Sequence, residues 1–138
     1  MDGTGLRALR ALTPIATPKL VPGFVAHHAL LGSFATPALR AALARALSHV
    51  SARTLAARLR DMADFDVRAE LHALDRPALY LRGRRDRLVS ARFGEEFLAT
   101  ARRGRIAEIE APHLLLQARP RDAAEAILDF VREVGAGA

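Results

Sequence analysis

Asp86 and His113 are the two side chains of this sequence whose types and spacing could together do chemistry. Asp86 stands in GRRDRLVS, residues 83–90, and His113 stands in EIEAPHLLLQARP, residues 108–120. A carboxylate that accepts the N–H of an imidazole holds the ring in one tautomer and stabilises its protonated form, so such a pair can serve as a base in hydrolysis. Both residues also have a structural interpretation, the aspartate as a turn residue paired with a neighbouring arginine and the histidine as a packed loop residue.

This chemistry requires two strands that end just before the two side chains. RPALYLRG, residues 76–83, is a short apolar run between a proline and a glycine, which predicts a buried strand. GRIAEIEAP, residues 104–112, predicts a second strand; a helix over about 91–102 precedes it, and Pro120 opens a last amphipathic helix. Strand, helix, strand, helix is an α/β unit with parallel strands. Because the loops after parallel strands open at the same edge of the sheet, the two side chains are expected to meet.

The chain divides near residue 75. Before that point the apolar spacing predicts helices, with capping signals at Thr36, which precedes a proline, and at Ser51. The sequence therefore predicts a helical region, residues 1–74, followed by a βαβα region, residues 75–138.

The net charge of +6 comes almost entirely from arginine, which raises the question of an acidic partner. The arginines are interleaved with Asp and Glu, and only 5% of the residues are aromatic, so we expect a solvated surface and no nucleic-acid partner. No apolar run approaches the roughly 20 residues of a membrane span. Residues 1–20 contain no uninterrupted apolar core of the kind found in signal peptides. We expect no membrane partner and a cytoplasmic location.

The residue types give little support to a metal or phosphate site. The absence of cysteine excludes disulfides and thiolate ligands. The spacing of the other four histidines matches no metal-ligand pattern, so no metal and no other cofactor is expected. These are His27, His28, His49 and His72. A cluster of arginines around the first turn could bind phosphate, but solvation or pairing with Asp86, Glu95 and Glu96 is the interpretation favoured. Its members are Arg82, Arg84, Arg85 and Arg87.

Two stretches carry a resemblance to a known family. PALYLRGRRDRLVS, residues 77–90, resembles the seventh strand and acid turn of α/β hydrolases. IEAPHLLLQARPRDAAEAILDFV, residues 109–131, is similar to their eighth strand, catalytic-histidine loop and final helix. The helical region resembles the cap domain that is inserted before the seventh strand. The resemblance implies a partial α/β-hydrolase fold and an esterase-like serine hydrolase, with Asp86 as the triad acid and His113 as the triad base.

The sequence departs from the family at the nucleophile. It contains no Gly-x-Ser-x-Gly elbow, and no His-Gly oxyanion loop. The resemblance therefore implies the C-terminal piece of a hydrolase of roughly twice this length, inactive alone because triad residues act as a unit. The alternative is a non-catalytic, degenerate hydrolase fragment that acts as an interaction module.

Two further expectations concern partners. Leu114 and Leu115, next to the histidine, could line an apolar substrate pocket or could belong to the core. If an N-terminal half completes the chain, the resemblance implies a small apolar ester as the substrate. A two-stranded sheet would have unpaired edges, which predicts self-association, a need for a complementing fragment, or a marginally folded chain.

Overall fold

The computed structural model describes residues 23–137, so what the sequence predicts for residues 1–22 lies outside the described residues. The chain divides into two compact units, which are described separately. The first contains residues 23–27 and 36–66, and the second contains residues 28–35 and residues from 67 onward. The predicted boundary near residue 75 differs from this division, because two segments before it group with the βαβα region.

The first unit is helical. Its elements are α2 (Gly23–Leu30), which continues into the second unit, α3 (Pro37–Ser48) and α4 (Ala52–Asp64). Both predicted caps are confirmed: the Thr36 hydroxyl accepts the N–H three residues ahead at 3.2 Å, and the Ser51 hydroxyl does the same at 3.0 Å. Such caps bind helix N–H groups that have no partner within the helix.

The second unit has the predicted order of strand, helix, strand, helix. Its elements are η1 (Gly32–Phe34), α5 (Arg68–Ala73), β1 (Ala78–Gly83), α6 (Arg92–Thr100), β2 (Gly104–Ile109), α7 (Leu115–Ala118) and α8 (Pro120–Ala136). The one-turn helix α7 was not predicted. No helix within residues 23–137 is both long and apolar enough to cross a membrane.

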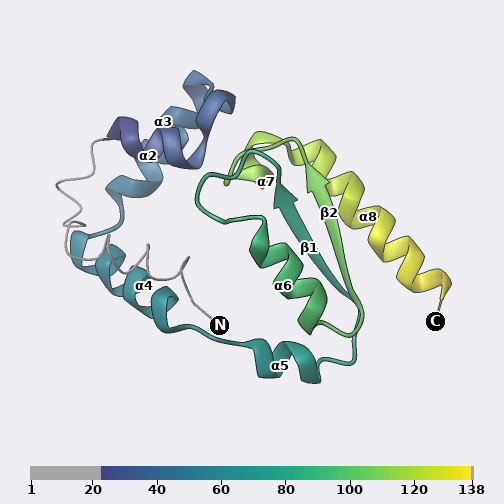
Figure 1. Cartoon of the computed structure of the whole chain (residues 1–138). Helices are drawn as coiled ribbons and strands as arrows, with labels where there is room; N and C mark the ends of the chain where they lie inside the picture. The colour runs from purple at the N-terminus through teal and green to yellow at the C-terminus, as the bar shows by residue number, and fades with distance from the viewer. Residues whose placement is uncertain (1–22, 138) are drawn as a thin grey trace. The chain divides into compact units, whose positions relative to one another are not determined.

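The strands β1 and β2 form a parallel sheet in which Ala78 faces Gly104 and Gly83 faces Ile109. Helix α6 covers one face and α8 covers the other (Figure 1). On the α6 face, the rings of Tyr80 and Phe97 lie 5.6 Å apart between centroids. The partial α/β fold expected from the sequence is therefore present, and both strands point to the same edge.

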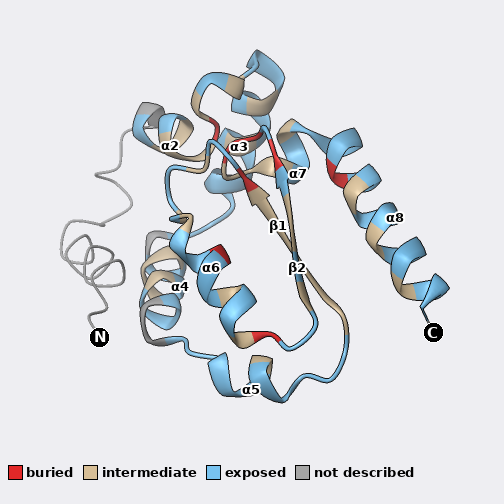
Figure 2. Cartoon of the chain, turned by 45° about the vertical axis from the view of Figure 1, so that its right-hand side comes forward, coloured by how far each residue is buried: buried red, intermediate tan, exposed pale blue. Residues whose placement is uncertain are grey.

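The core of the second unit is small. Ile109, Ala111 and Ala123 form its buried cluster, and Leu81 and Leu115 pack against it. Figure 2 shows how few segments are buried and how much of α8 is exposed. Large apolar side chains are therefore left in contact with solvent, notably Leu98, Leu116, Leu128 and Val131. Within the described residues each strand pairs only with the other, so the predicted self-association stays a prediction.

Candidate functional site

The turn after β1 is fastened to the segment after β2 by backbone hydrogen bonds. The N–H of Arg84 donates to the carbonyl of Ile109 at 2.8 Å, and the N–H of Arg85 donates to Ala111 at 2.9 Å. The N–H of Asp86 closes the turn on the carbonyl of Gly83 at 3.1 Å. These hydrogen bonds continue the pairing of β1 and β2 beyond the ends of the strands. They place Asp86 beside the loop that carries His113.

The carboxylate of Asp86 is held from two sides. Its Oδ1 accepts the backbone N–H groups of Leu88 and Val89 at 2.8 and 2.9 Å. This is the local bond pattern that makes aspartate a turn residue. The other oxygen, Oδ2, is left to bind a partner from outside the turn.

The loop that carries His113 is fixed on both sides. Ala111 and Pro112 before it are fully buried. The N–H of Leu114 after it donates to the carbonyl of Leu30 at 3.1 Å. Leu30 lies in the second unit although it is far away in sequence. The histidine ring therefore projects from an anchored backbone.

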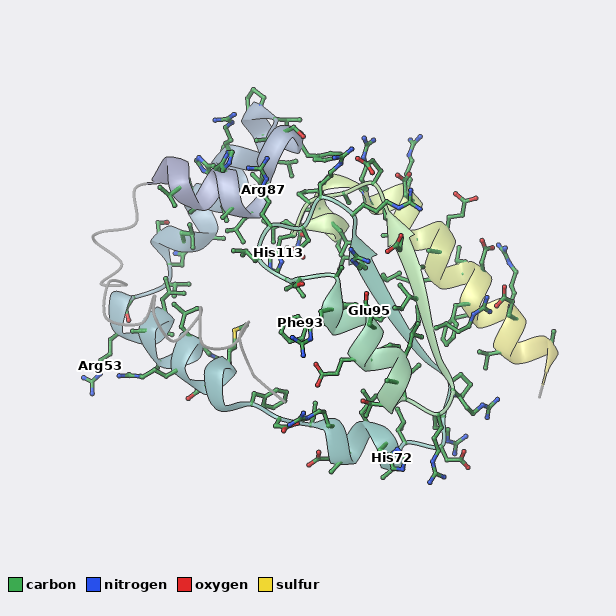
Figure 3. All side chains as sticks on the ribbon, in the orientation of Figure 1. Arg53, His72, Arg87, Phe93, Glu95 and His113 are labelled. Atoms are coloured by element: carbon green, nitrogen blue, oxygen red, sulfur yellow. The ribbon has the colours of Figure 1, made fainter. Side chains whose placement is uncertain are left out.

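The structure brings the two predicted residues together. Nδ1 of His113 lies 2.9 Å from Oδ2 of Asp86, with the histidine side chain 32% exposed and the aspartate 12%. Figure 3 shows His113 at the end of the sheet to which both strands point. With Nδ1–H donating to the carboxylate, Nε2 is left with its lone pair and can accept a proton. This geometry is that of a base held in one tautomer by an acid.

Asp86→Asn is expected to move the proton of the neutral His113 ring from Nδ1 to Nε2 while keeping the turn closed. The amide oxygen can still accept the two backbone N–H groups, but the NH₂ group then faces His113 and donates where the carboxylate accepted. We expect ¹⁵N–¹H spectra of the neutral ring to show the proton on Nδ1 in the wild type and on Nε2 in the variant. Asp86→Ala is the control, since it removes both functions and should also destabilise the turn. Identical ring spectra for the wild type and Asp86→Asn would contradict the assigned bond.

Tyr80 reports the charge of Asp86. Burial first, and then the negative charge of Asp86, raise the pKa of Tyr80 above its ordinary value, while Arg82 acts in the opposite direction. Tyr80 is the only tyrosine of a chain without tryptophan, so the absorbance of its phenolate can be titrated directly.

The raised pKa of Tyr80 predicts the effect of Asp86→Asn on the tyrosine titration and the pH dependence of the chain's stability. Asp86→Asn should lower the pKa of Tyr80, because it removes a charge that opposes the phenolate. Since the folded-state pKa exceeds that of an unfolded tyrosine, about 10, the corresponding stabilisation is present below that pH and lost as pH rises through the folded value. Tyr80→Phe should therefore flatten the loss of stability in alkaline urea denaturation. A Tyr80 titration curve that Asp86→Asn leaves in place would contradict the charge coupling.

The arginines beside Asp86 have other partners. Arg84 pairs with Glu108, with Nε 3.2 Å from Oε2, and Arg85 pairs with Glu110 at 2.5 Å. Arg87 instead contacts the ring of His28. The expected pairing of these arginines with Asp86, Glu95 or Glu96 is therefore wrong. The partners of Arg84 and Arg85 come from β2 and the residue after it, because a parallel sheet places neighbouring strand ends side by side, whereas His28 belongs to α2.

The predicted pocket-lining leucines lie elsewhere than in the pocket that the structure shows. Leu115 packs against the buried cluster, and Leu114 contributes a backbone bond to Leu30. An open pocket of about 380 Å³ lies instead beside the acid turn. Its lining consists of Gly32, Ser33, Arg85, Asp86, Arg87 and Glu110. A contact of either leucine with a substrate stays a prediction.

Metal-ligating groups do not gather in the part of the chain that the structure describes. Among those residues no group of three or more His, Cys, Asp or Glu side chains is placed to hold an ion. Sequence reasoning missed the segment around Gly32 and Ser33 as part of the site. No motif marks this segment, and only the fold brings it to the acid turn.

Comparison with known proteins identifies the fold. The sequence matches no protein-family profile and no curated protein. Similar solved structures include a hydrolase from Oleispira antarctica, with a TM-score of 0.72 and 16% identity over 96% of this chain and 48% of that one. A hydrolase from Pseudomonas aeruginosa PA01 has a TM-score of 0.64 and 22% identity over 94% of this chain and 51% of its own. The chain thus spans about half the length of the hydrolases that it matches and shares their fold over that half.

Proposed function

We propose that this chain supplies the acid and the base of a serine-type hydrolase acting on carboxylic esters. The observation that carries the proposal is the 2.9 Å contact between His113 Nδ1 and Asp86 Oδ2. Two backbone N–H groups on the other carboxylate oxygen support it, because they fix the acid independently of the histidine. The similarity to two hydrolases agrees with it at the level of the fold.

The pair would act in two steps. Nε2 of His113 takes the proton of a serine hydroxyl while that oxygen attacks the ester carbonyl, and the carboxylate of Asp86 stabilises the imidazolium that forms. The imidazolium then gives this proton to the departing alkoxide, which leaves an acyl-enzyme. Water repeats the sequence: His113 removes its proton, the acid is released, and the proton returns to the serine.

The serine would come from residues that this sequence does not contain. Three of its four serines have local structural bonds: Ser48 donates to a helix carbonyl, Ser51 caps α4, and Ser90 accepts the N–H of Arg92. The fourth, Ser33, lies in η1 and lacks the strand-to-helix elbow that exposes a nucleophile. The donors that stabilise the developing oxyanion would likewise belong to the missing part.

A chimera tests this proposal. The part of the O. antarctica hydrolase that this chain does not overlay would be joined to the 138 residues, and its reaction with a fluorophosphonate and with p-nitrophenyl esters would be measured. We expect covalent labelling and ester turnover, with mass spectrometry locating the label on a serine of the donor part. A folded chimera that carries the label on one of this chain's own serines, or that takes no label at all, would contradict the proposal.

A second candidate is a non-catalytic interaction module. It is favoured by the exposed apolar residues of α8, Leu128 at 52% and Val131 at 56%, and by the unpaired strand edges in the described part. Light scattering across a concentration series would show self-association of the chain through these surfaces. If the chain binds copies of itself and the chimera shows no turnover, this second candidate replaces the first.

A further inference from the structure

The pocket beside the acid turn has a polar lining and a volume at the low end of small-molecule sites, which span roughly 300–1,000 Å³. It is formed within the second unit alone, by residues of η1, the acid turn and the residue after β2. It adjoins the Asp86–His113 pair, because Asp86 belongs to both. Whatever occupies it lies next to the proposed acid, Asp86.

The two carboxylates of the pocket already have partners. Asp86 uses Oδ1 for two backbone N–H groups and Oδ2 for His113, and its side chain is only 12% exposed. Glu110 accepts the Nε–H of Arg85 at 2.5 Å. This bond, together with the negative charge of Glu110, raises the pKa of Arg85 above its ordinary value. Both carboxylates are therefore already bound by groups of this chain and do not require a cationic ligand as a partner.

Arg87 is the charge in the pocket without an acidic partner. Each of the arginines Arg82, Arg84 and Arg85 forms an ion pair with a glutamate, whereas the only hydrogen bond of the Arg87 guanidinium within the described residues is with the ring of His28. Arg87 Nη1 donates to His28 Nε2, which orients the planar group. Figure 3 shows Arg87 at the same end of the sheet as His113.

The backbone of η1 leaves room beside this guanidinium. Gly32 has φ of +52°, a left-handed conformation that glycine adopts without strain. A methyl group at this position would lie 3.8 Å from Nε of Arg87. Arg87 itself lines the open polar pocket, and an oxyanion there could accept the N–H groups that do not bind His28.

We propose that Arg87 binds a carboxylate or phosphate group of the substrate. A planar guanidinium binds such oxyanions through paired N–H bonds, which fix direction as well as charge. The inference rests on the proposed function, and it makes the substrate class small esters that carry an anionic substituent. Such a group on Arg87 would orient the ester relative to the base.

Titration of the ¹⁵N-labelled 138-residue chain tests this assignment without any catalysis. Sodium succinate and sodium phosphate would be added separately at low ionic strength, where exposed charges are least screened. We expect saturable shifts in the amides of Gly32, Ser33 and Arg87. Arg87→Gln should weaken binding at least tenfold. Arg84→Gln, which removes a paired arginine from the same turn, should change it less than twofold.

Tighter binding of succinate would indicate a carboxylate site, and tighter binding of phosphate would indicate a phosphate site. The proposal would be overturned if Arg84→Gln and Arg87→Gln weakened anion binding equally, or if the amide shifts were spread over all basic segments. If a variant fails to fold, the distribution of amide shifts in the wild-type chain still decides the question. Two measurements separate the claims. His113→Gln should keep anion binding, because His113 does not line the pocket. Anion binding by the wild-type chain, together with a chimera of wild-type sequence that has no turnover, would leave Arg87 as a binding residue and reject the hydrolase.

Discussion

His113→Ala is expected to lower kcat of the proposed chimera on the order of a millionfold, with little change in KM. Among the described residues, the imidazole is the only group placed against Asp86 that can accept a proton, and a serine hydroxyl without a base is a poor nucleophile at neutral pH. The loss falls on kcat because the proton transfer occurs in the transition state. The measurement is turnover of p-nitrophenyl acetate by the chimera.

A second histidine provides the matched control. His72 is exposed on α5 and has no role in the site, so His72→Ala should keep turnover within about twofold, as surface substitutions usually do. Circular dichroism would confirm that both variants are folded. If His113→Ala kept a tenth or more of the wild-type kcat, the Asp86–His113 contact would be a structural pair and not a catalytic one.

The contact between Asp86 and His113 could be predicted because the positions of both residues follow from local signals. Pro77 before and Gly83 after the apolar stretch limit the first strand, and Gly104 before and Pro112 after limit the second. Parallel pairing then requires the two following loops to share an edge. The observed register places Gly83 opposite Ile109, so the two strands end side by side and the loops after them share an edge.

The parts that the sequence did not predict depend on contacts between distant residues. Leu31 is fully buried and Leu30 binds the histidine loop, so residues 28–35 belong to the second unit although they lie in the helical half. Nothing in the local pattern of these residues differs from that of an ordinary helix end. The partners of Arg84 and Arg85 were missed for the same reason, since cross-strand neighbours are set by register and not by proximity in sequence.

Gly83 is the residue on which the meeting of acid and base depends. It is buried at the last position of β1, and a Cβ atom there would lie 2.6 Å from the carbonyl oxygens of both Ala111 and Pro112. These atoms are backbone, so they cannot turn aside as the end of a side chain can. The same close approach allows the bond from Arg85 N–H to Ala111 that draws the acid turn to the histidine loop.

Gly83→Ala is therefore expected to destabilise the chain by about 3 kcal/mol or more and to separate Asp86 from His113. Urea denaturation gives the first quantity, and loss of the Nδ1–H signal of His113 reports the second. Gly135→Ala is the matched control: no atom lies within 4 Å of the added methyl group in α8, so it should be neutral or stabilising by up to about 1 kcal/mol. Equal stability of the two variants with the His113 signal intact would mean that the strand ends tolerate a side chain, and that the close packing at Gly83 does not position the acid.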